Sequence, residues 1–288
     1  MTSIARLPFP QLTRTIQLNV TMVSIALTIA GSDSSGGAGI QADLATFSAF
    51  KVYGASVLTA LTAQNTTGVR AIFDVTAQFV AQQLDAVLDD LVVAAAKTGM
   101  LARAPIIEAL SERLRSRPVP FLVVDPVMVA ASGDLLLDPA ATAAMRDLMV
   151  PLATLVTPNL REAEVLTGRV VTTVAQMRDA ARALVDLGAG AALVKGGHLA
   201  GAATDIFFDG DRMREFTASR IATRNTHGTG CTLSAAVTAG LALGNDWETA
   251  IANAKSYVTR AIKMAPDIGH GHGPVNHFVP VDEEGKQR

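Results

Sequence analysis

The sequence has little cysteine, little charge imbalance and no long apolar run. Cys231 is the only cysteine among 288 residues, which excludes an internal disulfide and a zinc site built from several cysteines. A single thiol favours a reducing compartment, and we expect the cytoplasm. The net charge of −2, from 24 basic and 26 acidic residues, argues against nucleic-acid binding. No apolar run approaches ~20 residues, so no membrane span is predicted.

The composition is that of a folded chain with an unusual start. Hydrophobic residues make up 49% and charged residues 17%, enough for a sizeable core. Residues 1–21 contain Arg6 and Arg14 and several threonines but no acid, since the first acidic residue is Asp33. This composition loosely resembles a transit peptide. We favour a flexible N-terminal extension over residues 1–21, followed by a single domain over residues 22–288.

Short β-prone runs alternate with helical patterns along the chain. This alternation predicts one α/β domain, with a mainly parallel sheet covered by helices on both faces. A hairpin is expected over residues 204–217, turning at Asp209-Gly210. Helices are predicted over Phe79–Leu91, Met177–Leu187, Thr229–Leu243 and Trp247–Ala265. Strands are predicted at Ser24–Ala30, Ser56–Leu61, Leu91–Lys97, Phe121–Asp125, Thr154–Thr157 and Ala192–Lys195.

A polar or glycine-rich cluster follows each predicted strand of the parallel sheet. These clusters read GSDSSGGAG, AQNT, TGM, PVM, PNLRE and GGH in chain order. In open parallel sheets the ligand crevice lies outside the carboxyl ends of the strands. The periodicity therefore predicts that six separate clusters meet at one edge, which is stronger evidence for a site than any single motif.

The first cluster contains a match to the dinucleotide-binding pattern GxGxxA, from Gly37 to Ala42. That pattern needs an acidic residue ~20 positions later to hold a ribose, and no acid occurs between Asp43 and Asp74. A nicotinamide cofactor is therefore excluded, and no Walker A lysine follows either. We expect a flexible loop that wraps a polar ligand, with Asp43 in the first turn of the next helix.

Three oxygen-bearing side chains and one lysine are placed at the same edge. Asp125 ends one strand, and Asn159 and Glu162 open the helix that follows another. Glu162 could be only a capping partner of the helix, but the three residues also resemble a magnesium site completed by phosphate oxygens. Lys195 could reach phosphate in the crevice or extend its amine from the sheet edge into solvent.

The stretch Gly228-Thr229-Gly230-Cys231 is predicted to open a helix. A glycine-rich turn at a helix N-terminus presents free N–H groups and suits phosphate. The same position lowers a thiol pKa from ~8.5, which would make Cys231 a base or a nucleophile. Buried cysteine is also common as simple packing, but the position beside an anion site favours a functional role.

The histidines near the C-terminus suggest a metal site only weakly. His270, His272 and His277 lie close in sequence, but the glycines between them impose no rigid spacing and no carboxylate follows Asp267 before position 277. We therefore favour loop structure over metal ligation and a metallohydrolase. A non-catalytic vitamin sensor is a further alternative, which the retention of phosphate- and metal-binding groups disfavours.

Taken together, these stretches resemble the bacterial hydroxymethylpyrimidine/phosphomethylpyrimidine kinases of the ribokinase-like superfamily. The resemblance covers about Ile25 to Phe278. It rests on ALTIAGSDSSGGAGIQADL, ALTAQNT, KTGML, VVDPVMVA-SGD, TPNLREAE, LVKGGH, NTHGTGCTLSAA and GHGHGPVNHF. It implies phosphorylation by ATP of 4-amino-5-hydroxymethyl-2-methylpyrimidine, then of its monophosphate, in thiamin biosynthesis. It also implies Mg²⁺ and a homodimer.

The resemblance also implies roles for individual residues in binding the substrate, the metal and the phosphates. Gln64 would hydrogen-bond the aminopyrimidine, Met100 and Val127 would line its ring, and Asp43 would lie near its polar end. Asp125 and Glu162 would serve Mg²⁺, Asn159 and Lys195 would serve the phosphates, and Gly228, Thr229, Gly230 and Cys231 would form the anion hole with its catalytic thiol.

One position leaves the substrate open between two vitamers. Most members of the superfamily have an aspartate base where this chain has Cys231. The cysteine fits the pyrimidine kinases, but it also fits a minority of pyridoxal kinases that share much of the motif set. Both substrates are hydroxymethyl heteroaromatics of similar size. Pyridoxal kinase is therefore the alternative function.

Overall fold

The computed structural model describes residues 23–128, 139–197, 199 and 201–281. The predicted extension over residues 1–21 lies outside this part of the chain. The strands are β1 (Ile25–Asp33), β2 (Tyr53–Asn65), β3 (Gly68–Asp74), β4 (Ala95–Thr98), β5 (Leu122–Val124), β6 (Leu155–Val156), β7 (Ala192–Val194), β8 (Ala203–Phe208) and β9 (Met213–Ala218). The helices are α1 (Gly39–Ala49), α2 (Ala77–Asp90), α3 (Ala104–Ser116), α4 (Pro139–Ala144), α5 (Leu160–Thr167), α6 (Val174–Asp186), α7 (Thr229–Ala242) and α8 (Trp247–Lys263).

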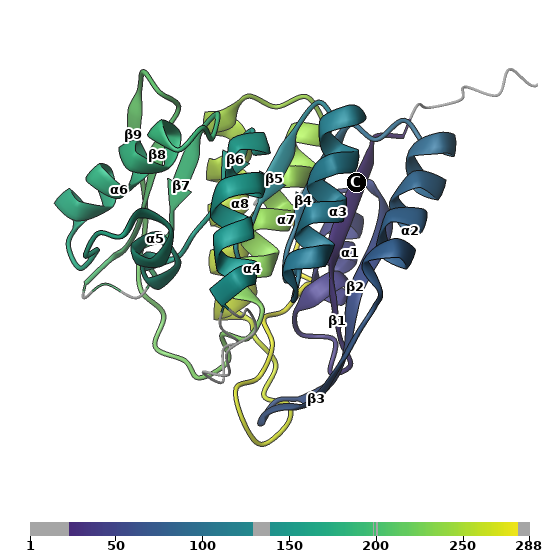
Figure 1. The fold of residues 1–288 in the computed structure, drawn as a ribbon. Coiled ribbons are helices and arrows are strands. Elements are labelled where there is room, and N and C mark those ends of the chain that lie inside the picture. The colour runs from purple at the N-terminus through teal and green to yellow at the C-terminus, as the bar shows by residue number, and fades with distance from the viewer. Residues whose placement is uncertain (1–22, 129–138, 198, 200, 282–288) are drawn as a thin grey trace, which may run out of the picture.

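These strands form one sheet in the order β3-β2-β1-β4-β5-β6-β7-β8-β9 (Figure 1). The five pairings from β2 through β1, β4, β5 and β6 to β7 are parallel, whereas β3, β8 and β9 are added antiparallel at the two sides. The predicted mainly parallel α/β fold is therefore confirmed. Among the described residues, no helix is long and apolar enough to cross a membrane.

Helices cover both faces of the sheet (Figure 1) because its strands are apolar on both sides. Leu27 and Ile29 of β1 are buried in a core with residues of α2, α3 and α6. Their neighbour Ala26 points to the opposite face, into a second core with Phe47 of α1 and Tyr257 of α8. The burial of successive side chains on alternate faces explains why these strands read as continuous apolar runs.

The predicted elements differ from the observed ones chiefly at their ends. The hairpin forms as β8 and β9, and α7 and α8 end one and two residues before the predicted limits. The strand predicted from Leu91 begins only at Ala95, because α2 continues to Asp90. Strand β2 runs four residues past Leu61 and pairs with β3, which the sequence analysis missed. Strand β3 is largely exposed, so it lacks the apolar alternation that marks a half-buried strand.

Candidate active site

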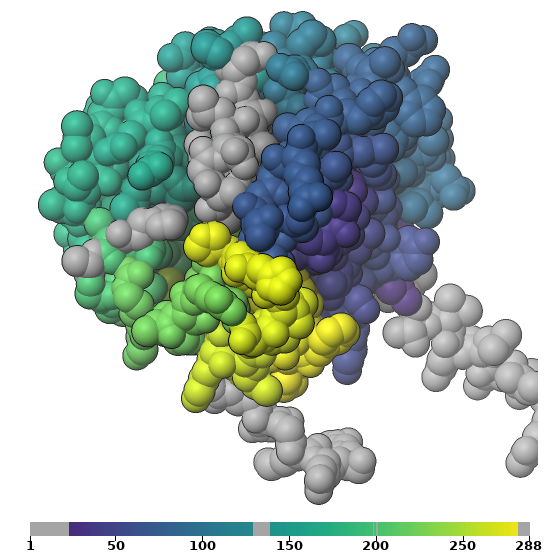
Figure 2. Space-filling view, turned by 90° about the horizontal axis from the view of Figure 1, so that it is seen from below, coloured from purple at the N-terminus to yellow at the C-terminus, as the bar shows by residue number. Residues whose placement is uncertain are grey.

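Segments distant in sequence meet at the carboxyl edge of the sheet, which Figure 2 shows from below. The C-terminal segment (yellow) lies against the turn between β2 and β3 (blue). There the N–H of His270 donates to Oγ1 of Thr66 at 3.1 Å, and the N–H of His272 donates to the carbonyl oxygen of Thr66 at 2.8 Å. The predicted convergence at this edge therefore occurs, and it includes the C-terminal segment.

The glycine-rich turn predicted to form an anion hole lies at the N-terminus of α7. Gly228 is the N-cap in a left-handed conformation (φ +81°), and a Cβ there would overlap the carbonyl oxygen of Gly37. Only glycine therefore lets the two glycine-rich turns touch. The N–H of Thr229 already donates to the carbonyl of Thr226 at 3.2 Å. The N–H groups that remain as predicted donors to an anion are therefore those of Gly228, Gly230 and Cys231.

Cys231 lies in the first turn of α7 as a free, partly exposed thiol. The N–H of Gly39, at the start of α1, points at its sulfur. Burial raises the pKa of Cys231 to about 11; Lys97 opposes this rise, while Asp43 and Asp125 add to it. The net shift of this pKa is therefore opposite to the one expected from the helix N-terminus, because the loss of solvation outweighs it.

Lys195 and Asp125 meet beside the anion hole, as predicted. Nζ of Lys195 lies 2.7 Å from Oδ1 of Asp125, whose side chain is 1% exposed. A Cβ on Gly230 would lie 3.3 Å from the same Nζ, so the amine borders the first turn of α7. Ser234 donates to Oδ2 of Asp125 at 3.2 Å and to the carbonyl of Cys231 at 3.0 Å. The lysine therefore contacts the crevice rather than bulk solvent.

Asn159 and Glu162 form a capping box at the start of α5. The side chain of Asn159 accepts from the N–H of Glu162 at 3.0 Å, and Glu162 accepts from the N–H of Asn159 at 2.8 Å. The capping alternative is thus confirmed. Burial raises the pKa of Glu162 to about 7, opposed by Lys195 and reinforced by Asp125. Glu162 is therefore also part of the charged cluster around Lys195.

The carboxylates of this cluster fit a metal that arrives with phosphate. In the part of the chain that the structure describes, no three His, Cys, Asp or Glu side chains gather as a metal cage. Asp125 and Glu162 lie close enough to interact electrostatically. Mg²⁺ is usually held by one or two carboxylates, waters and substrate phosphates. Two carboxylates next to an anion hole match that pattern.

Asp43 forms a buried ion pair with a lysine of the sheet. It lies in the second turn of α1, and its carboxylate is 2.9 Å from Nζ of Lys97 on β4, with both side chains 0% exposed. Thr28 of β1 also donates to it at 2.6 Å. Helix α1 turns Asp43 inward, where a buried carboxylate needs a buried partner, and its predicted place near the polar end of the substrate stays a prediction.

Gln64 and Met100, both predicted to contact the pyrimidine, border the same turn after β1. The methyl group of Met100 packs on Gly31. The hydroxyl of Thr62 donates to the carbonyl of Ser32 at 2.8 Å, and its oxygen lies 3.3 Å from Oε1 of Gln64. Val127 follows β5, and its N–H donates to the carbonyl of Asp125 at 2.8 Å. The side chains predicted to contact the pyrimidine ring therefore lie next to those predicted to bind phosphate.

The sequence analysis missed the buried pair of Asp33 and His227. Nε2 of His227 is 2.7 Å from Oδ2 of Asp33 and 3.3 Å from Nε2 of Gln64. Burial would raise the pKa of Asp33, but hydrogen bonds from His227 and Ser35 outweigh it and lower the pKa. In the sequence, His227 is one polar residue before Gly228-Thr-Gly, and nothing there distinguishes it from an ordinary loop residue.

The remaining histidines have separate contacts. Nδ1 of His272 lies 3.2 Å from the carbonyl oxygen of Arg224. His277 lies 3.0 Å from Oγ1 of Thr232, and burial lowers its pKa. These contacts hold the C-terminal segment to the end of β2 and to α7. They give the side chains of His272 and His277 partners within the protein.

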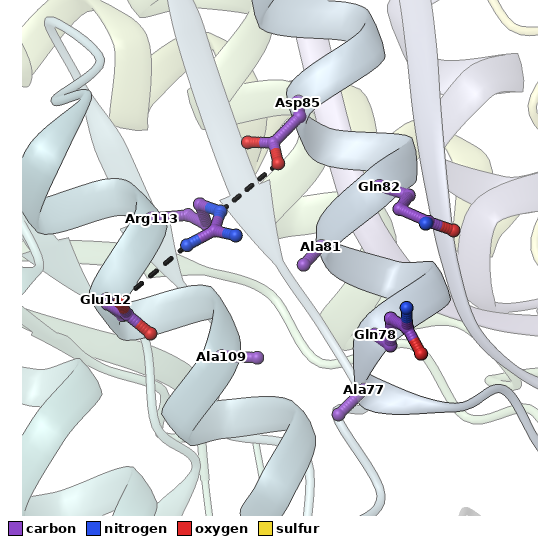
Figure 3. A pocket seen from close by; sticks show the side chains of 8 residues that line it. All are labelled: Ala77, Gln78, Ala81, Gln82, Asp85, Ala109, Glu112 and Arg113. Carbon is purple, nitrogen blue, oxygen red and sulfur yellow. Dashed lines mark hydrogen bonds and ion pairs between the residues drawn. The ribbon is translucent and has the colours of Figure 1, made fainter.

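A pocket also lies between α2 and α3, away from the carboxyl edge (Figure 3). Arg113 bridges it, with Nε 3.2 Å from Asp85 and one guanidinium nitrogen 3.7 Å from Glu112. Its lining contains no predicted site residue and consists of Ala77, Gln78, Ala81, Gln82, Asp85, Ala109, Glu112 and Arg113. The residues predicted to form the site therefore lie outside this pocket.

Comparison with known proteins places the chain among vitamin kinases. A family model described as phosphomethylpyrimidine kinase matches residues 33–276. The hydroxymethylpyrimidine/phosphomethylpyrimidine kinase of Rhizobium meliloti is 57% identical over 261 residues, which cover 89% of this chain and 98% of that protein. The residues matched by the family model include every predicted site residue, from Asp43 to Cys231.

Two solved structures share the fold and split between the two vitamer classes. An ADP complex of Bacillus subtilis pyridoxal kinase is 41% identical with a TM-score of 0.83, covering 89% of this chain and 98% of that one. The phosphomethylpyrimidine kinase of Clostridium difficile is 44% identical with a TM-score of 0.75, covering 82% and 98%. Similarity of fold alone therefore does not select the vitamer.

Proposed function

Because the chain belongs to the phosphomethylpyrimidine kinase family, we propose that it uses ATP to phosphorylate 4-amino-5-hydroxymethyl-2-methylpyrimidine and then its monophosphate, in thiamin biosynthesis. The family resemblance and the kinase activity predicted from the sequence are confirmed by the comparisons. The observation that carries the proposal is the meeting of Lys195, Asp125 and the first turn of α7 at the carboxyl edge. Phosphoryl transfer asks mainly for such positioning and charge stabilisation.

Different residues of the site would bind the phosphates and the pyrimidine ring. The N–H groups of Gly228, Gly230 and Cys231 would hold the migrating phosphoryl group, with Lys195 as a nearby positive charge. Asn159 caps α5 at the same edge and would contact the phosphate chain of ATP. Gln64, Met100 and Val127 would hold the ring, as the family resemblance implies.

Asp125 and Glu162 would hold Mg²⁺. The ion would neutralise charge between the phosphates of ATP. Burial would raise the pKa of Asp125, but Lys195 and Lys97 outweigh it and lower the pKa, which keeps the carboxylate ionised. In the ligand-free chain Lys195 balances this charge at 2.7 Å.

Cys231 would take the proton of the substrate alcohol in the first step. A primary alcohol is poorly acidic, and a positioned base contributes typically 10²–10⁴-fold. In the second step the acceptor is a phosphate monoester, which is largely ionised at pH 7 because its second pKa is ~6. The thiol is therefore required as a base only in the first step.

The choice between pyrimidine and pyridoxal is tested by the products. We expect purified protein with Mg-ATP to convert the hydroxymethylpyrimidine to mono- and diphosphate, resolved by mass spectrometry. The variant Lys195→Met controls for contaminating kinases and should lose both products. Phosphorylated pyridoxal without pyrimidine diphosphate would contradict the proposal and favour the alternative function.

We also propose a cytoplasmic homodimer. The single cysteine of each chain is an unpaired thiol, which suits a reducing compartment. The β2–β3 extension, at the bottom of Figure 1, carries Leu61 directly opposite Phe73. Directly opposed residues of an antiparallel pair share one face, and these two side chains are 44% and 69% exposed. Such an apolar surface marks an interaction site.

Phe73→Asp should convert the dimer to monomers, as measured by light scattering during size-exclusion chromatography. A buried charge at the centre of an interface opposes association by several kcal/mol. Val92→Asp is the matched control, since Val92 is an exposed apolar residue away from β3 and should leave the mass unchanged. A dimer that survives Phe73→Asp would place the interface elsewhere.

A further inference from the structure

The side chain of Gln64 is held by a buried histidine that the kinase mechanism does not use. His227 is 7% exposed. Its backbone N–H donates to the carbonyl of Gly273 at 3.1 Å, and its carbonyl accepts from the N–H of Val275 at 3.3 Å. The ring packs against Gly37, where a Cβ would come within 2.5 Å of it. His227 is therefore fixed by both main chain and ring.

Asp33 determines which nitrogen of His227 carries the hydrogen. Its Oδ1 accepts from the N–H of Ser35 at 2.8 Å and from the Ser35 hydroxyl at 2.7 Å, and its Oδ2 accepts from the N–H of Ala38 at 2.9 Å. A carboxylate with these donors is ionised. Because Oδ2 of an anion lies 2.7 Å from Nε2 of His227, that nitrogen must carry a hydrogen.

This hydrogen sets the orientation of the Gln64 amide. With Nε2 of Gln64 3.3 Å from Nε2 of His227, two N–H donors would face each other. Turning the amide by half a revolution replaces this contact by one between Oε1 of Gln64 and the same N–H, which donates to Asp33 and can share its hydrogen with a second acceptor. It also places the NH₂ group beside Oγ1 of Thr62, which can accept because its own hydrogen goes to Ser32. The turned orientation is the one that satisfies all partners.

We propose that His227, held by Asp33, is a positioning residue that fixes the Gln64 amide to recognise an aminopyrimidine edge. The inference rests on the proposed function, in which Gln64 contacts the ring. An aminopyrimidine presents an N–H donor next to a ring-nitrogen acceptor, and one amide orientation pairs with both. A 4-oxopyrimidine presents the reverse order, and pyridoxal has no exocyclic amine. His227 would thus contribute to the choice between vitamers.

The test is a ratio of two affinities, measured by calorimetry. The probes are 4-amino-5-hydroxymethyl-2-methylpyrimidine and its 4-oxo analogue, and wild type should prefer the amino compound. In His227→Phe only the hydroxyl of Thr62 still orients the amide, so this preference should fall roughly fivefold to tenfold. His227→Gln retains an N–H for Asp33 and should keep most of the preference. A merely structural loss would weaken both ligands equally and leave the ratio unchanged, which would overturn the proposal.

Two further measurements separate this inference from the proposed function. Gln64→Ala should weaken binding of the amino compound; if it does not, the assignment of Gln64 to the ring fails. If Gln64→Ala weakens binding but His227→Phe leaves the ratio intact, only the positioning role fails. ¹⁵N NMR of wild type requires no variant: it should show a hydrogen on Nε2 of His227, and a bare Nε2 would overturn the proposal.

Discussion

Replacing Cys231 by alanine is expected to slow phosphorylation of the pyrimidine alcohol about 10²- to 10⁴-fold, the usual contribution of a positioned base. The second phosphorylation should slow by less than about tenfold, since its acceptor oxygen is already ionised near pH 7. The substitution leaves the main chain of the anion hole in place. Separate single-turnover measurements with the alcohol and with the monophosphate would give the two rates.

The thiol of Cys231 is not a preformed thiolate, because burial raises its pKa. With a pKa of about 11, about one molecule in ten thousand is ionised at pH 7. The thiol must therefore first release its own proton to water when the substrates bind, and the resulting thiolate then accepts the proton of the alcohol. Lys97 favours that thiolate, whereas Asp43 and Asp125 oppose it. A covalent phosphocysteine is the alternative, and phosphorylated enzyme trapped after ATP alone would support it instead.

Cys231→Ser is the matched control, because it keeps the size of the side chain and replaces the thiol by a far weaker acid. It should slow the first step nearly as much as alanine does. Equal losses in the two steps would contradict the base and show that Cys231 closes the anion hole by packing. The ratio of the two losses is informative because damage to ATP binding affects both steps.

The parallel sheet made much of the site predictable from the sequence. Strands that alternate with helices bring their carboxyl ends to one edge. This rule placed Lys195 and Asp125 together, which lie 2.7 Å apart across 70 positions of sequence. The start of α7 followed from glycines before an Ala-rich apolar run. These predictions depended on periodicity and connection, which a single sequence contains.

Buried pairs of polar residues were not predictable in the same way. The family resemblance placed Asp43 near the substrate, and nothing in the sequence showed that the turn of α1 directs its carboxylate at Lys97. The pairing of His227 with Asp33 joins residues 194 positions apart. Burial of a polar side chain depends on which partner meets it across the core, and neither composition nor spacing specifies that partner.

Lys97→Met is expected to lower the free energy of unfolding by about 3–5 kcal/mol, as measured by urea denaturation. Burial raises the pKa of Asp43 and would lower that of Lys97, but the Asp43 charge outweighs the latter effect. We take the pair as ionised, because its atoms are 2.9 Å apart and Thr28 also donates to the carboxylate. Removing the lysine would leave that charge buried without its cation.

The double variant Asp43→Asn with Lys97→Met tests this cause directly. Since it removes the stranded charge, it should recover about 2 kcal/mol or more relative to Lys97→Met alone. Arg113→Met is the matched control on the surface: its partner Asp85 is 35% exposed, so its loss should be below about 1 kcal/mol. Additive losses in the double variant would contradict an unpaired charge and assign the stability of Lys97 to the packing of its alkyl chain between α1, α7 and the sheet.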